Sequence, residues 1–272
     1  MSRVEIDRER CARDGLCVLE CPLSLLETDI EGYPVPGPRL EAACIGCGHC
    51  LAVCPRGCLR LGGVAQESLA VATPAPDVSP GTLVGFMQSR RSVRHFAARP
   101  VPRETLVACL EAARYAPSAL NGQPAEFLVI EDKACIAALA AGCADLLRAT
   151  GRSPDFLRAY DAGEDSILRR APCLVLAHAA AEAPIPPATD CVIALAHLEL
   201  AAHFHGLGAC WAGILRYVAS VHPPVRDVLA LPDGHVMYGG LMLGYPRFAL
   251  RHLPPRKPLR VTWRCAQGLV SP

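Results

Sequence analysis

Four cysteines stand close together as Cys44-x2-Cys47-x2-Cys50-x3-Cys54, and Pro55 follows the last of them. Cysteine thiolates bind metals, and three sulfurs set three positions apart can converge on different irons of one cubane cluster. Structural zinc also uses C-x2-C pairs, but it needs two pairs a dozen or more residues apart. The spacing therefore favours an iron–sulfur cluster over zinc.

A similar run precedes this one and consists of Cys11, Cys17 and Cys21-Pro22, with Asp14 where the register requires a cysteine. The intact run has the spacing of bacterial ferredoxins, in which the fourth cysteine of each run binds the other cluster. We therefore expect two four-iron clusters. One would be bound by Cys44, Cys47, Cys50 and Cys21, and the other by Cys11, Asp14, Cys17 and Cys54.

The cluster beside Asp14 carries an oxygen ligand in place of a thiolate, so it holds either four irons or three. The alternative for the first run is a decayed site without a cluster. Cys58 fits no ligand position in either run, and we expect it to be a small core residue.

Polar groups that could bind an anionic cofactor gather in two later segments. Arg90, Arg91, Ser92 and Arg94 offer guanidinium forks and a hydroxyl, which suit a phosphate, although such a run can equally be a solvated basic face. A turn at 117–123 could offer hydrogen bonds to a ring or a polyol, or could simply end a helix. Its candidate residues are Pro117, Ser118, Asn121 and Gln123.

These segments resemble the nitroreductase family. RRSVRHF (90–96), APSALNGQP (116–124), GLGACWAG (206–213) and GGLMLGYP (239–246) occur in the order and at the spacing of that family, and the resemblance covers most of residues 81–260. It implies that Ala212 and Gly213 offer backbone N–H groups to an FMN ring. It also implies a second phosphate contact from Arg256 and Lys257, and a turn at 117–123 that reaches the FMN across a dimer interface.

The elements around these residues predict an α+β protein with two domains. Residues 1–63 are expected to form a small ferredoxin-like iron–sulfur domain, 64–80 a linker with three prolines, and 81–272 a nitroreductase-like FMN domain with an enclosed mixed sheet. Helical spacing is seen in 80–90, 102–116 and 132–149, and short apolar strands are expected at 126–131, 173–179 and 235–243. The capped apolar pattern at 189–208 predicts a long buried helix.

Composition narrows the choice of compartment and partners. The net charge is +1, so nothing indicates a nucleic acid or an anionic membrane as partner. The charged N-terminus lacks the apolar core of a signal peptide, which predicts an intracellular, cytoplasmic protein.

Among the histidines, His203 and His205 are two positions apart on the expected helix and are interpreted as structural.

The resemblance implies an oxidoreductase and a homodimer. Clusters move single electrons whereas FMN can store two, so we expect the clusters to pass electrons to FMN, which reduces a small electron-poor acceptor of nitro, quinone or enone type. The electron donor would be an external ferredoxin or NAD(P)H. Two alternatives stay open: a non-catalytic electron-transfer or redox-sensing protein, and a flavin-modifying or flavin-consuming enzyme.

Overall fold

The computed structural model describes residues 4–71, 78–265 and 268–270. Its N-terminal part is built on a three-stranded antiparallel sheet in the order β1 (Val4–Ile6), β4 (Leu59–Leu61) and β5 (Val64–Ala65). A hairpin of β2 (Leu26–Thr28) and β3 (Pro34–Pro36) lies between the two cysteine runs. The insertion predicted as hairpin-like is thus a hairpin.

Three short helices carry or flank the cysteines: α1 (Leu16–Leu19), α2 (Leu40–Ala43) and α3 (His49–Val53). The helices α1 and α3 each begin after a left-handed glycine, Gly15 with φ 70° and Gly48 with φ 74°. A glycine adopts this conformation at little cost, so each cysteine run can turn sharply into its helix. The repeat in the sequence is therefore also a repeat in the backbone.

The expected linker begins inside this small sheet. Its first two residues form β5, and a 3-10 turn, η1 (Gln66–Ser68), follows them. Residues 72–77 of the segment lie outside the described residues. The strand pairing of the front unit thus extends to Ala65, past its predicted end at residue 63. The domain boundaries stay predictions.

The larger part of the chain is organised around a four-stranded sheet in the order β6 (Glu126–Ile130), β7 (Cys173–Ala180), β9 (His235–Gly244) and β8 (Gly208–Trp211). These four strands pair antiparallel. A parallel bridge between Ser92 and Ala209 adds the segment before the first large helices to the edge of β8. The sheet is therefore mixed, as expected.

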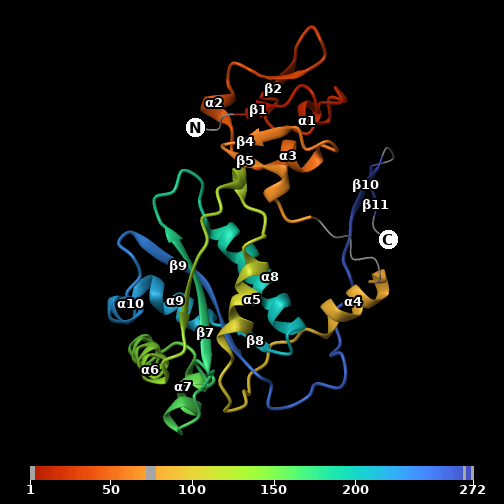
Figure 1. Cartoon of the computed structure of the whole chain (residues 1–272). Helices are drawn as coiled ribbons and strands as arrows, with labels where there is room; N and C mark the ends of the chain where they lie inside the picture. Colours follow the sequence, from red (N-terminus) through yellow and green to blue (C-terminus); the bar gives the residue numbers. More distant parts are fainter. Residues whose placement is uncertain (1–3, 72–77, 266–267, 271–272) are drawn as a thin grey trace.

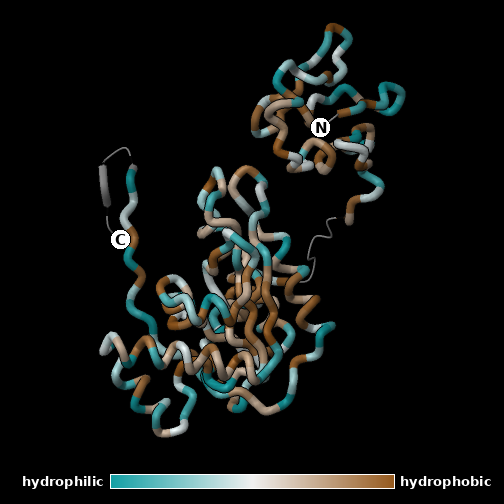
Figure 2. Tube along the Cα trace, turned by 90° about the vertical axis from the view of Figure 1, so that its left-hand side faces the viewer, coloured by the Kyte–Doolittle hydropathy of each residue, from teal (hydrophilic) through white to brown (hydrophobic). Residues whose placement is uncertain are grey.

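Helices cover both faces of this sheet (Figure 1). One face packs against α5 (Arg103–Ala113) and α8 (Ala188–Phe204), and the other against α6 (Lys133–Thr150), α9 (Gly213–Val221) and α10 (Pro223–Leu229). On β7, Leu174 and Leu176 join one core while Val175 and Ala177 join the other, because successive side chains of a strand point to opposite faces. Hydrophobic residues concentrate in these strands and in the helices around them (Figure 2). The α+β prediction is confirmed.

Two segments project from this layered core. The helix α4 (Pro80–Ser89) has no buried residue, and its Leu83, Val84 and Met87 are each about half exposed. The chain after β9 runs outward to the hairpin β10 (Trp263–Cys265) and β11 (Gly268–Val270), on the same side as α4 in Figure 1. A further helix, α7 (Pro154–Asp161), packs on α6. Among the described helices, none is long and apolar enough to cross a membrane.

Candidate functional site

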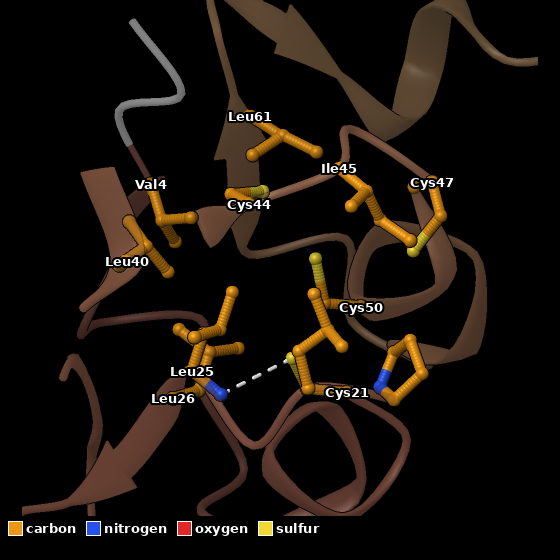
Figure 3. A pocket seen from close by; sticks show the side chains of 13 residues that line it. Val4, Cys21, Leu25, Leu26, Leu40, Cys44, Ile45, Cys47, Cys50 and Leu61 are labelled. Carbon is orange, nitrogen blue, oxygen red and sulfur yellow. Dashed lines mark hydrogen bonds between the residues drawn. The ribbon is translucent and has the colours of Figure 1, made fainter. Parts of the chain in front are cut away.

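One apolar cavity in the front unit is lined by the four cysteines that were predicted to bind a single cluster (Figure 3). Aliphatic side chains from β1, β2, α2 and β4 surround them. The backbone N–H of Leu25 donates a hydrogen bond to Cys21 Sγ at 3.3 Å. The cavity-lining cysteines are Cys21, Cys44, Cys47 and Cys50.

The cysteine sulfurs are not gathered closely around a single point. Two thiolates at the zinc–sulfur distance of about 2.3 Å from one tetrahedral ion would lie about 3.8 Å apart. Across the described chain, no three cysteine sulfurs all lie within 4.8 Å of one another. Burial raises the pKa of the Cys50 thiol to about 11, so a metal would have to displace its proton. This arrangement fits a multi-iron cluster, whose ligands bind different irons.

Three of the ligands predicted for the second cluster come together in the front unit, namely Cys11, Cys17 and Cys54. Cys17 and Cys54 are buried, and Cys17 interacts electrostatically with both of the other thiols. Asp14 is exposed, and its carboxylate accepts a hydrogen bond from Leu16 N at 3.1 Å, at the start of α1. The carboxylate thus has a backbone partner beside the cysteines.

Cys58 is buried in the core of the front unit, as expected, but its surroundings were not foreseen. Its Sγ lies 3.4 Å from Cys54 Sγ, and Cys58 also interacts with Cys11. Burial, followed by these two neighbours, raises its pKa to about 12. Sequence reasoning missed this neighbour of the cluster ligands, although its position four residues after Cys54 is visible in the sequence.

In the larger domain, four arginines from two distant segments come together. Burial, followed by the charges of Arg256, Arg90 and Arg94, lowers the pKa of Arg91. Like charges gathered in this way favour a bound anion. Lys257 is exposed, beside Arg256 in the chain.

Arg90 also has an internal partner. Its Nη1 lies 2.7 Å from Glu199 Oε1, and Glu199, a buried residue of α8, accepts a second hydrogen bond from Trp211 Nε1 at 3.2 Å. This contact ties the basic segment to α8 and to the end of β8. Of the four arginines, Arg90 is thus partly engaged by the protein itself.

The basic segment lies against β8 because that strand begins with a glycine. Val93 N donates to Ala209 O at 2.8 Å, next to the Ser92 bridge. A Cβ on Gly208 would meet Val93 side-chain atoms at 2.5 Å, which is closer than any real contact. The close approach therefore requires glycine at this position.

At the other end of β8 lie Ala212 and Gly213, the two residues expected to offer backbone N–H groups to a flavin. They differ in whether that N–H is already used within the protein. Ala212 N donates to Gly240 O at 2.9 Å within the sheet. Gly213 is the first residue of α9, and its N–H has no acceptor in the part of the chain that the structure describes. A Cβ at Gly213 would meet nothing within 4 Å, so the position is open to a ligand. Gly213 is the donor that remains free.

The turn at 117–123 is strained and tightly held. Leu120, Asn121 and Gln123 all have positive φ values of 48°, 54° and 45°. Gln123 N donates to Ser118 Oγ at 2.9 Å, and Gln123 Nε2 donates to Asn121 Oδ1 at 3.1 Å. Non-glycine residues keep such conformations only where their surroundings enforce them, and they cluster at functional sites.

One contact joins this turn to the front unit. Asn121 Nδ2 donates to the backbone oxygen of Ile45 at 3.2 Å. Ile45 stands between Cys44 and Cys47 and lines the cysteine cavity. The loop that carries the predicted cluster ligands thus touches the turn predicted to reach a flavin.

Residues 87–245, more than half of the chain, match the Nitroreductase family. The chain belongs to the nitroreductase family. Residues 3–55 match the 4Fe-4S dicluster domain, which confirms the predicted iron–sulfur domain with two clusters in front of the nitroreductase domain.

Curated relatives agree with this assignment. A protein of Methanothermobacter thermautotrophicus, named as an NADH dehydrogenase/NAD(P)H nitroreductase, is 27% identical over 172 residues, which cover 62% of this chain and 80% of the relative. The 5,6-dimethylbenzimidazole synthase of Rhodospirillum rubrum is 29% identical over 187 residues and covers 61% of this chain and 82% of its own length. The chain is therefore an enzyme of the oxidoreductase type found in this family.

Solved structures show the same fold. A nitroreductase of Bacteroides fragilis with bound FMN superposes with a TM-score of 0.53 at 25% identity, covering 65% of this chain and 94% of that one. A nitroreductase of Desulfitobacterium hafniense reaches a TM-score of 0.56 at 24% identity over 64% of this chain and 93% of its own. The fold of the larger domain is that of a nitroreductase.

In the described part of this chain, predicted flavin residues line three separate cavities. Arg90 and Arg91 line one cavity, Gly213 lines a second, and the turn with Ser118 and Gln123 lines a third. Within one chain, the turn therefore faces a different cavity from the arginines and from Gly213.

Proposed function

We propose that the chain is an FMN-dependent oxidoreductase in which the front domain delivers electrons, one at a time, to the flavin site of the nitroreductase domain. The observation that carries this proposal is the hydrogen bond from Asn121 to Ile45 O. It joins the loop of the cysteine cavity to the turn predicted to reach the flavin. Residues 1–63 would act as the electron-entry domain and residues 81–272 as the flavin domain.

The turn is suited to hold this contact in a fixed position. Ala119 N donates to both carboxylate oxygens of Asp190, at 3.2 and 3.3 Å, so the turn is anchored on the buried helix α8. Together with the bond to Ser118, this anchor keeps Asn121 in its left-handed conformation. A preorganised contact would keep the distance between the electron-donating cluster and the electron-accepting flavin constant.

The FMN phosphate would be held by Arg91, Arg94 and Arg256, supported by Ser92 and Lys257. The gathered positive charge fits a phosphate, and the FMN in the Bacteroides fragilis relative supports this cofactor. Gly213 N–H, at the start of α9, would donate to the flavin ring. When bound, FMN supplies the conversion between one-electron and two-electron chemistry.

The turn and the arginines would meet across a homodimer interface. Leu83, Val84 and Met87 on α4 leave an apolar helix face half exposed, and Leu250, Leu253, Leu259 and Trp263 add exposed apolar side chains along the C-terminal arm. Exposed apolar surface of this kind is typical of a subunit interface. A second copy of this chain would cover it and complete each site with the turn of the other subunit.

The acceptor would bind in the cavity beside Gly213. Val192, Trp211 and Tyr238 contribute apolar and aromatic surface there, which suits a flat molecule. This cavity favours an enzyme with a small acceptor of nitro, quinone or enone type over a sealed electron relay. The many thiolates need a reducing compartment, so a cytoplasmic location is part of this proposal.

Reoxidation of the reduced protein tests the proposed reaction. The anaerobic holoprotein would be reduced to completion and mixed with a panel of nitro, quinone and enone compounds while flavin absorbance is followed. We expect at least one class to reoxidise the flavin with matching loss of the acceptor. If no compound of any class reoxidises it, the assignment of the acceptor is wrong.

A further inference from the structure

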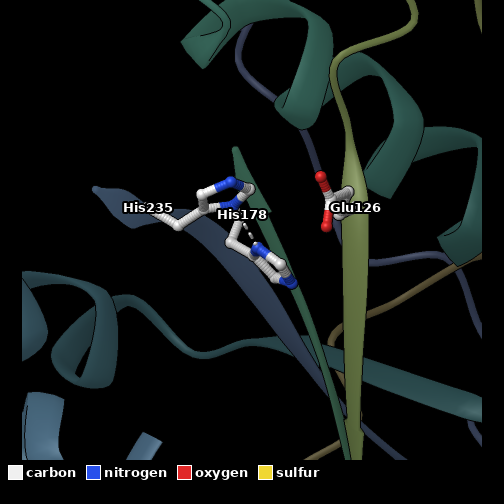
Figure 4. Close-up of side chains that lie close together, drawn as sticks. All are labelled: Glu126, His178 and His235. Atoms are coloured by element: carbon white, nitrogen blue, oxygen red, sulfur yellow. Dashed lines mark hydrogen bonds between the residues drawn. The ribbon is translucent and has the colours of Figure 1, made fainter. Parts of the chain in front are cut away.

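Three potential metal ligands meet at one end of the main sheet, away from the cysteines. Glu126 is the first residue of β6, His178 is near the end of β7, and His235 is the first residue of β9 (Figure 4). One donor atom from each of them lies within 4.8 Å of the other two. Among the described residues, no other three potential metal ligands lie so close together.

Strand register brings them onto the same face of the sheet. Glu126 is paired directly with His178, and Ala180 is paired with His235. The pairing of β7 with β9 shifts between Ala177 and His178, so a bulge lies next to the site. Bulges re-aim side chains and are frequent beside functional sites. Three adjacent strands thus hold the three ligands without help from a mobile loop.

The distance between the two imidazoles suits a shared ion. His178 Nδ1 lies 3.0 Å from His235 Nδ1. Two nitrogens that each bind one ion at about 2.0 to 2.1 Å would be about 3 Å apart at bond angles between octahedral and tetrahedral. The competing explanation is a histidine pair without an ion. In such a pair, the Nδ1–H of one ring donates a hydrogen bond to Nδ1 of the other.

The three donors combine two imidazoles with one carboxylate. His178 is buried, His235 is partly exposed, and Glu126 is exposed at the start of β6. Glu126 supplies a negative charge that offsets part of the charge of a cation.

We propose that Glu126, His178 and His235 bind one divalent ion of the zinc type, separate from the iron–sulfur clusters. Two histidines and one carboxylate are a common protein set for zinc and leave a fourth position for water or another ligand. Glu126 follows the strained 117–123 turn by three residues. The ion would therefore tie the exit of that turn to β7 and β9.

Zinc uptake by the complete protein tests the site. Cluster-loaded and FMN-loaded protein would be dialysed anaerobically against limiting Zn²⁺, with zinc and iron measured together. We expect one zinc per chain with unchanged iron in the wild type. Glu126→Gln and His235→Gln should each lower the affinity by 10-fold or more, whereas His197→Gln, at an exposed position on α8, should leave it unchanged.

Thermal unfolding supplies a second readout, because a ligand that binds the native state raises the melting temperature. Zinc should raise it for the wild type and for His197→Gln, and should have no effect on Glu126→Gln. Glu126 is exposed, so its conservative variant should fold even if His235→Gln does not. The proposal is overturned if the wild type takes up no zinc, or if Glu126→Gln binds it as tightly as the wild type does.

Discussion

Single residues from opposite ends of the nitroreductase domain carry the proposed phosphate site. Arg94 lies five residues after the end of α4, and Arg256 belongs to the arm after β9, yet both lie close enough to Arg91 to lower its pKa. No periodicity within either segment encodes this meeting, because it depends on the path of the chain around the sheet. Only the family resemblance pointed to it from the sequence.

Arg94→Ala and Arg256→Ala should each weaken FMN binding. Each variant removes a charge-assisted contact worth about 1.5 to 3 kcal/mol, which corresponds to roughly 10- to 150-fold in affinity. Flavin content after prolonged dialysis measures the effect. Arg148→Ala is the matched control, because Arg148 pairs with Asp145 and Asp161 on the surface of α6 and α7. Unchanged flavin in both site variants would count against the phosphate assignment.

Asp14 is the residue that departs from the ferredoxin pattern, and it should make one iron labile. A carboxylate binds the iron of such clusters less well than a thiolate does. We expect brief air oxidation to convert the cluster at Cys11, Cys17 and Cys54 to a three-iron form, and Asp14→Cys to resist this loss. Iron analysis with electron paramagnetic resonance decides the matter. A wild type that keeps eight irons, or never holds more than four, contradicts the ligand assignment.

At the scale of elements, local pattern predicted most of the architecture. The apolar spacing in 80–90, 102–116 and 132–149 corresponds to α4, α5 and α6, and the run at 189–208 to the buried α8. The strands β6, β7 and β9 lie where short apolar runs were expected. Each of these elements carries its signal within its own residues, as helical spacing, as a short apolar run or as a capped apolar stretch.

Contacts between elements could not be predicted in the same way. The approach of Cys58 to Cys54 depends on how the loop after α3 closes, and the meeting of Glu126, His178 and His235 depends on strand order and on a bulge. Neither leaves a repeating pattern in the sequence. The missed features are thus the long-range ones, which arise from topology rather than from local propensity.

The exposed face of α4 should be part of the dimer interface. Val84→Asp together with Met87→Asp would place charges on an apolar face that is half exposed in the isolated subunit, and burying them would be costly. We expect this double variant to become monomeric and to lose FMN, because each site would lack the turn of the partner subunit. Molecular mass in solution and flavin content measure both effects. Thr82→Asp, on the opposite side of the same helix, is the control. A stable monomer that keeps FMN would contradict the shared site.

At the scale of the whole molecule, two units with separate cores meet at the hydrogen bond between Asn121 and Ile45 O. The front unit has its own apolar core around the cysteines, as the proposed entry point for electrons requires. Strand β5 pairs with β4, so a clean removal of this unit must extend to residue 71 rather than end at 63. The remaining chain would keep the sheet, both helical layers and the proposed flavin site.

The most direct test compares flavin reduction by reduced ferredoxin in the full chain and in a chain that lacks residues 1–71. Rapid mixing under anaerobic conditions follows the flavin absorbance, after confirming equal FMN content and equal reduction by dithionite. We predict rapid flavin reduction in the full chain and a rate at least 10-fold lower in the shortened chain, because the path past Cys44, Ile45 and Asn121 is gone. Equal rates of reduction by ferredoxin in the two proteins would contradict the proposal that electrons enter through the iron–sulfur domain.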